Sequence, residues 1–159
     1  MHFEEGFHLV VNRDFPTFTL IEPEIRKLVE SGDFGQKLRI YIQDDPSYLS
    51  DLSQSVSDAS LESSYRLKIE IVPALIRFEN GEETSRSIGW VRKEWSQLFK
   101  EPMFGEHLPE SRPGCGSLTV IPGVKETLDA RFGDLPLNSR TTDSWLFVQE
   151  DLQDYFQGS

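Results

Sequence analysis

Residues 1–100 alternate between short apolar runs and amphipathic stretches, a pattern typical of proteins that mix strands and helices. Residues 7–11 form a short, largely apolar run, which predicts a buried strand. Apolar residues then recur at helical spacing, which predicts a helix that runs to about Glu30. Thr17 and Thr19 lie where that helix begins, and either would serve as its cap.

The next apolar segments predict further elements of both kinds. Residues 38–42 alternate between apolar and polar side chains, which indicates a half-buried strand. Apolar positions within the serine-rich residues 47–65 favour a second helix. Branched residues dominate 69–78, and the Asn80-Gly81 pair that follows predicts a two-residue turn. Residues 84–88 then return as an antiparallel strand.

A terminal helix over residues 91–99 completes the order β-α-β-α-β-β-α, so we expect an α/β fold. Proline and glycine crowd the chain between 102 and 116, which indicates a loop. A short helix is predicted for about 123–131, and an apolar island stands at 145–148. We therefore predict a domain at 1–100 and a loop-rich extension at 101–159, which is an appendage or part of a larger second domain.

Charge and composition narrow the classes of partner. The chain has 16 basic and 27 acidic residues, a net charge of -11, so nucleic acid and anionic membranes are poor partners. No apolar run approaches the roughly 20 residues that span a bilayer. One cysteine rules out an internal disulfide and a cysteine-based zinc site, and the three histidines are scattered. We expect a cytoplasmic protein without a metal and without a cofactor.

Two stretches resemble the thioredoxin-like family. One is residues 8–25, a strand, a turn and a helix with Pro23 inside it. The other is residues 71–82, a Val-Pro strand that ends in Asn-Gly, followed by Ile-Gly-Trp at 88–90. The resemblance covers residues 7–99 and implies the minimal core of that family.

The redox motif of the family is missing. Phe15, Pro16, Thr17 and Phe18 stand where redox-active members have Cys-x-x-Cys, and phenylalanine supports neither step of thiol exchange. The resemblance implies that Pro73 is the cis-proline beside the site, and that the residues before it, Val72 among them, hydrogen-bond an extended peptide. The two phenylalanines are either an exposed binding patch or part of the core.

Cys115 lies in a second unusual segment, Arg112-Pro113-Gly114-Cys115-Gly116-Ser117. The flanking glycines allow close backbone approach, and Arg112 is near enough in sequence to stabilise a thiolate. The segment resembles the Cys-Gly-Ser element of proteins that join a thioredoxin-like domain to a selenoprotein-type redox domain. The second thiol is absent, because Leu118 follows Ser117.

Three functions follow, and the residues leave open whether the chain is an enzyme. The first is a protein- or peptide-binding module that uses Phe15, Thr17, Phe18, Val72 and Pro73 and lacks dithiol oxidoreductase activity. The second is a single-cysteine redox enzyme in which Cys115 is catalytic and Arg112 assists it. The third is a glutathione-binding domain, with residues 84–87 loosely placed where such proteins hold the γ-glutamyl group.

Overall fold

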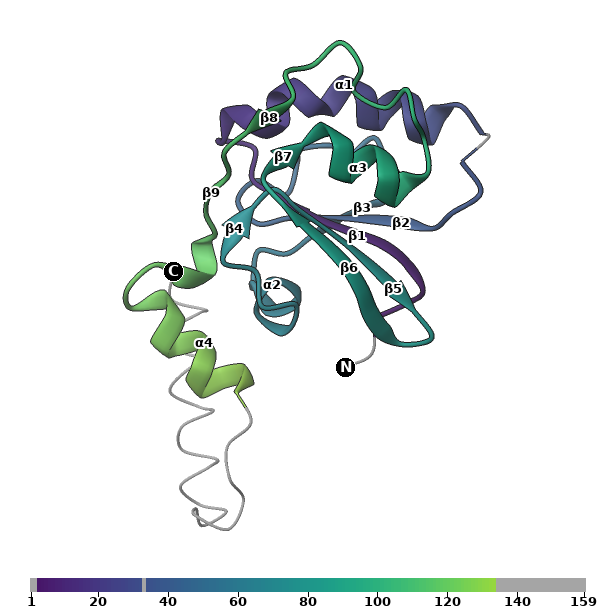
Figure 1. Cartoon of the computed structure of the whole chain (residues 1–159). Coiled ribbons are helices and arrows are strands. Elements are labelled where there is room, and N and C mark those ends of the chain that lie inside the picture. The colour runs from purple at the N-terminus through teal and green to yellow at the C-terminus, as the bar shows by residue number, and fades with distance from the viewer. Residues whose placement is uncertain (1–2, 33, 134–159) are drawn as a thin grey trace.

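A central mixed sheet organises the protein, whose computed structural model describes residues 3–32 and 34–133 (Figure 1). The sheet has five strands in the order β3-β2-β1-β5-β6. β1 pairs in parallel with β2 and antiparallel with β5, and β2 pairs in parallel with β3. The strands are β1 (Gly6–Val11), β2 (Leu38–Ile42), β3 (Ser55–Ser57), β5 (Ala74–Glu79) and β6 (Glu82–Ile88).

Within residues 3–32 and 34–133, four α-helices and several short elements accompany this sheet. The helices are α1 (Pro16–Glu30), α2 (Glu62–Arg66), α3 (Arg92–Phe99) and α4 (Val124–Phe132), with a 3-10 turn η1 (Leu118–Val120) before α4. In the part of the chain that the structure describes, two small ladders lie outside the main sheet. They pair β4 (Ile71–Val72) with β9 (Cys115–Gly116), and β7 (Trp90–Val91) with β8 (Ser111–Arg112). The mixed α/β class predicted from the sequence is confirmed.

One face of the sheet carries the larger apolar core. α1 and α3 lie over this face (Figure 1). Alternate residues of β1 (Phe7, Leu9 and Val11) point into it because successive side chains of a strand face opposite sides. The buried members contributed by the helices and by the chain beyond them are Phe18, Ile21, Ile25, Leu28, Trp95, Phe99 and Phe104.

The opposite face holds a second core around Val10, Tyr41 and Ile76. His8 is buried on this face, where its Nε2 donates to the Glu4 carbonyl oxygen and its Nδ1 accepts from the Tyr41 hydroxyl. Burial is the main cause that lowers the pKa of His8, which favours the neutral ring. The predicted half-burial of β2 holds at Arg39, which is exposed, and is wrong at Tyr41, which is 5% exposed and packs in the second core.

The predicted helix at 47–65 is wrong. Turns lead instead into the edge strand β3, and α2 is only five residues long. Leu49 and Leu61 have positive φ angles of 59° and 64°, a backbone conformation that interrupts a helix. Leu49 and Leu52 are nevertheless buried, so the apolar pattern located core residues and gave the wrong element.

The hairpin prediction is confirmed. β5 and β6 are antiparallel, and Asn80 and Gly81 both have positive φ, 54° and 80°, as their turn requires. The helix predicted for 123–131 is confirmed as α4. Phe104 packs into the larger core, so the core extends past residue 100. The apolar island at 145–148 lies outside the described residues.

Candidate functional site

Residues 111–117, which we call the strap, cross the edge of the fold beside Pro73. Figure 1 shows this segment passing from the start of α1 towards α4. Cys115 stands opposite Val72 and Gly116 opposite Ile71 in an antiparallel ladder. The Val72–Pro73 peptide bond is cis. The backbone edge that the sequence predicted as a peptide-binding edge is thus paired with a segment of the same chain.

The strap lies against the fold so closely that glycine is required in two places. A Cβ atom on Gly114 would overlap Cγ2 of Ile71 and lie 2.7 Å from the Val72 carbonyl oxygen. Gly89 has a φ of +72°, and a Cβ there would lie 3.0 Å from the Gly114 nitrogen and 3.1 Å from the Arg112 carbonyl oxygen. Gly89 and Gly114 therefore let two backbones pass in contact.

Thr17 holds the strap from the opposite side. Its hydroxyl donates to the Pro113 carbonyl oxygen at 3.0 Å. The expected capping role of Thr17 and Thr19 is wrong, since α1 begins after Phe15 without a side-chain cap and with proline in its first turn. Thr17 is thus a predicted binding residue whose side chain hydrogen-bonds an extended segment.

The other predicted binding residues are largely buried. Phe18 is 1% exposed and packs edge-on against Tyr48, so for Phe18 the core interpretation holds. Phe15 is half-buried. Val72 and Pro73 are buried as side chains, and Val72 meets the strap through its backbone. A ligand on this edge would contact backbone groups far more than these side chains.

A buried polar network fixes the end of the strap. The Gln43 side-chain amide donates to the hydroxyls of Ser117 (2.7 Å) and Ser64 (2.8 Å), and its oxygen accepts the Leu118 N–H at 3.1 Å. The Thr119 hydroxyl donates to the Ile69 carbonyl oxygen at 2.7 Å and lies 2.8 Å from the Ser117 hydroxyl. Sequence reasoning missed this network, because isolated Gln, Ser and Thr residues carry no spacing signal.

The network continues to Asp58. The Ser64 hydroxyl and the N–H groups of Ser63 and Ser64 donate to the Asp58 carboxylate. Burial raises the pKa of Asp58, and these hydrogen bonds oppose the rise. The Asp58 carboxylate thereby orders the start of α2. Through Ser64, α2 joins the network of Gln43, Ser117 and Thr119, which we call the polar anchor of the strap.

Cys115 and Arg112 belong to different ladders, Cys115 opposite Val72 and Arg112 opposite Trp90. Cys115 is half-buried and packs against the core around Val10, while Arg112 is exposed. Burial raises the pKa of the Cys115 thiol. A nucleophilic cysteine needs the opposite shift, so the setting of this thiol disfavours the single-cysteine redox alternative.

The side chains of Thr84, Arg86 and Ser87 already have partners in the fold. The Thr84 hydroxyl donates to the Arg77 carbonyl oxygen, and the Ser87 hydroxyl donates to Glu94 at 2.6 Å. Arg86 pairs with Glu83 at 2.7 Å. These contacts engage three of the four residues that the glutathione alternative would have used.

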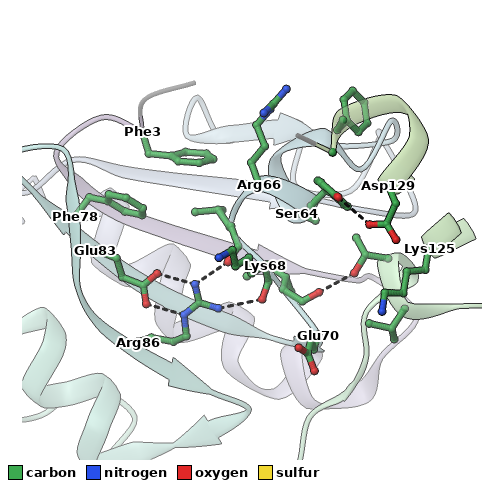
Figure 2. A pocket seen from close by; sticks show the side chains of 17 residues that line it. Phe3, Ser64, Arg66, Lys68, Glu70, Phe78, Glu83, Arg86, Lys125 and Asp129 are labelled. Atoms are coloured by element: carbon green, nitrogen blue, oxygen red, sulfur yellow. Dashed lines mark hydrogen bonds and ion pairs between the residues drawn. The ribbon is translucent and has the colours of Figure 1, made fainter. Parts of the chain in front are cut away.

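A cavity of about 670 Å³ lies on the other side of the strap's anchor, between α2, β6 and α4. Figure 2 shows Arg86 on its floor, donating to the backbone carbonyl oxygens of Leu67 (2.6 Å) and Lys68 (3.2 Å) and paired with Glu83. The Tyr65 hydroxyl donates to Asp129 of α4 at 2.7 Å. Further charged residues on the wall are Arg66, Lys68, Glu70 and Lys125. Because both signs of charge are present, the cavity does not select an anionic or a cationic ligand.

Among residues 3–32 and 34–133, no cluster of three or more His, Cys, Asp or Glu side chains is arranged to hold a metal ion. No helix in the same residues has the length and apolar character needed to cross a membrane.

Comparisons with known proteins add no relative. No model of a protein family matches the chain, and none of the curated proteins matches it. The assignment of function therefore depends on the strap, the edge beneath it and the residues that hold the two together.

Proposed function

We propose that this chain is a thioredoxin-like protein without dithiol oxidoreductase activity, whose function is to bind an extended peptide segment on the β4 edge beside Pro73. The observation that carries the proposal is the pairing of Ile71 and Val72 with Cys115 and Gly116. Strand addition of this kind is a common way to bind peptides, because backbone hydrogen bonds supply affinity for many sequences.

The start of α1 supports the binding function over thiol exchange. Phe15 and Phe18 occupy the positions of the two thiols expected from the resemblance, and Phe18 is committed to the core. Thr17 supplies a hydroxyl that donates to a backbone carbonyl oxygen of the bound segment. Backbone groups at the edge and the Thr17 hydroxyl support peptide binding, and phenylalanine at both thiol positions of the family pattern speaks against dithiol exchange.

The proposal is tested with the whole chain and a synthetic peptide of residues 111–117 carrying Cys115→Ser. We expect millimolar peptide to shift the backbone amide NMR signals of Thr17, Val72 and Gly89, whereas a peptide that also carries Gly114→Val leaves them in place. Insulin reduction in the presence of dithiothreitol should match the rate without protein. The proposal fails if no signal at the edge moves at any peptide concentration, or if insulin is reduced catalytically.

A further inference from the structure

The middle of the strap buries little of its own surface. Residues 111–113 and Gly116 are exposed, and Gly114 and Cys115 are half-buried. Releasing these residues would transfer little apolar area to water, apart from the Cys115 side chain. Segments with few buried contacts open at a small fraction of the free energy of global unfolding.

Both ends of the strap are held much more firmly than its middle. Before it, the Trp90 indole N–H donates to the Pro109 carbonyl oxygen at 2.8 Å, and the Arg92 N–H donates to that of Glu110 at 2.9 Å. At its other end, Ser117, the last residue of the strap, is 1% exposed, and Thr119 beyond it is 6% exposed. The middle therefore can leave the edge while both ends stay in place.

An open strap would leave the edge with unused binding groups. The backbone of Ile71 and Val72 would lose its ladder partners, and Thr17 would lose the carbonyl oxygen of Pro113. Unpaired strand edges readily accept another strand, and their backbone groups are costly to leave unpaired away from water. The exposed side chain of Ile71 (40% exposed) and the bare backbone of Gly89 would border the vacated place.

From these observations we infer that the strap regulates the edge as an internal ligand, and that a partner segment binds only when the strap's middle leaves. The inference builds on the proposed peptide-binding function. The contacts of the strap also define the partner chemically. It is an extended segment with glycine at the position of Gly114, because a Cβ there meets Ile71 and Val72, and with a backbone carbonyl oxygen just before that glycine for Thr17.

A closed strap should measurably reduce the affinity of the edge for a peptide. When the binding-competent state is only a fraction of the population, the apparent dissociation constant rises in inverse proportion to that fraction. Any change that opens the strap without altering the edge should therefore tighten peptide binding. Gly114→Val is such a change, since the added side chain belongs to the strap and meets Ile71 and the Val72 carbonyl oxygen.

The experiment measures two quantities on the full chain. The first is the affinity of the Cys115→Ser peptide of residues 111–117, followed by amide NMR shifts. The second is the rate at which Cys115, the one cysteine of the sequence, reacts with a thiol reagent, which reports strap opening. We expect Gly114→Val to raise both the affinity and the thiol rate by about tenfold or more. Peptide binding to the unsubstituted chain should also raise the thiol rate.

A matched control and a second variant keep the test decisive. Gly35→Val introduces the same side chain where a Cβ meets nothing within 4 Å, and should change neither quantity. Ser117→Ala loosens the strap from its other end without adding bulk, because the Gln43 amide loses its acceptor. It should act in the same direction if Gly114→Val does not fold.

The outcomes separate the inference from the function on which it rests. If the peptide binds the unsubstituted chain and both strap variants equally, while binding leaves the thiol rate unchanged, the strap does not regulate the edge and peptide binding stands. If Gly114→Val or Ser117→Ala speeds the thiol reaction but no protein binds the peptide, the edge opens without accepting a ligand. That result overturns both the inference and the proposed function.

Discussion

The chain beyond α3 is anchored on the two faces of the sheet by different chemistry. On the α1–α3 face, Phe104 stacks on Trp95 with ring centroids 6.3 Å apart and lies 5.0 Å from the Phe99 ring. On the opposite face, Gln43 donates to the Ser117 hydroxyl and accepts the Leu118 N–H, and the Thr119 hydroxyl donates to the Ile69 carbonyl oxygen. The strap crosses between an aromatic anchor and a polar one.

The two anchors should fail in different ways. Aromatic packing depends on shape, so it should be sensitive to added volume and tolerant of polarity changes nearby. A buried hydrogen-bond network depends on complete pairing, so it should be sensitive to the loss of one member. The middle residues of the strap take part neither in the aromatic packing nor in the buried hydrogen-bond network. We therefore expect these residues to move while both anchors hold.

The largest effect should come from Gly105→Ala at the aromatic anchor. Gly105 has a φ of +70°, and a Cβ there would lie 2.6 Å and 2.7 Å from two ring carbons of Trp90. We expect the free energy of unfolding to fall by about 2–4 kcal/mol, because the substitution adds left-handed backbone strain and overpacks the contact with Trp90. The measurement is the urea unfolding midpoint, with the m-value checked for constancy.

Gly32→Ala is the matched control for that prediction. Gly32 has a φ of +73° and nothing within 4 Å of its would-be Cβ, so it shares the backbone strain without the contact. Gly32→Ala should lower the free energy of unfolding by about 1–2 kcal/mol. If the two variants are equally destabilised, the Trp90 contact is not what anchors this segment.

Gln43→Leu should have the next largest effect, at the polar anchor. It removes the donor to Ser117 and Ser64 and the acceptor of the Leu118 N–H. Leaving buried groups unpaired costs about 1–3 kcal/mol, which lowers the melting temperature by roughly 2–12 °C in a chain of this size. Thermal unfolding followed by circular dichroism measures the change in melting temperature. The control is Gln97→Leu at an exposed position of α3, whose free energy of unfolding should stay within about 0.5 kcal/mol of that of the unsubstituted protein.

A smaller and more local effect is expected for Thr17→Val. The substitution keeps the shape of the side chain and removes only the donor to the Pro113 carbonyl oxygen. Because a neutral hydrogen bond contributes about 1 kcal/mol, the reaction of Cys115 with a thiol reagent should speed up about fivefold. Global stability should change much less, since the opening is confined to the strap. Exposed Thr19→Val is the control, and an equal rate in both variants would show that Thr17 does not hold the strap.

The anchors also show where sequence reasoning succeeds. The strand at 7–11, the Asn80-Gly81 turn and the helix near 123–131 are encoded locally, by periodicity or by the φ angles that a turn demands. Gly114 could be singled out because glycine next to cysteine signals close backbone approach. Which backbone it approaches, that of Ile71 and Val72, is a pairing across more than forty positions that a local pattern does not encode.

The failures have the same physical origin. The apolar positions at 49 and 52 are compatible with a helix or with buried turns, and tertiary packing selected the turns. Thr17 satisfies the sequence rule for a helix cap, yet its hydroxyl is used 96 positions away by Pro113. Gln43 is polar at a strand end, which is ordinary in sequence, and only the folded chain brings it to Ser117.

The finest test of the difference between anchors and strap is the titration of Cys115. Burial raises the pKa of this thiol, so the pH midpoint of its alkylation should lie above that of the denatured protein, which is about 8.5. Gly114→Val should move the midpoint back towards the denatured value, because the open strap exposes the thiol, whereas Gly105→Ala should not. In the unsubstituted chain, the Cys115 thiol of the folded state keeps its proton at a pH where the thiol of the unfolded state has lost it. The stabilisation linked to this group is therefore complete below the unfolded pKa and falls as pH rises through the folded pKa.

Comparing urea unfolding of the unsubstituted chain and Cys115→Ser across about pH 8–10 isolates that decline, which the serine variant should lack. A midpoint well below the denatured value would reverse the argument. The folded strap would then stabilise a thiolate, and Cys115 would be a nucleophile presented by the strap, not a half-buried side chain that packs the strap against the core around Val10.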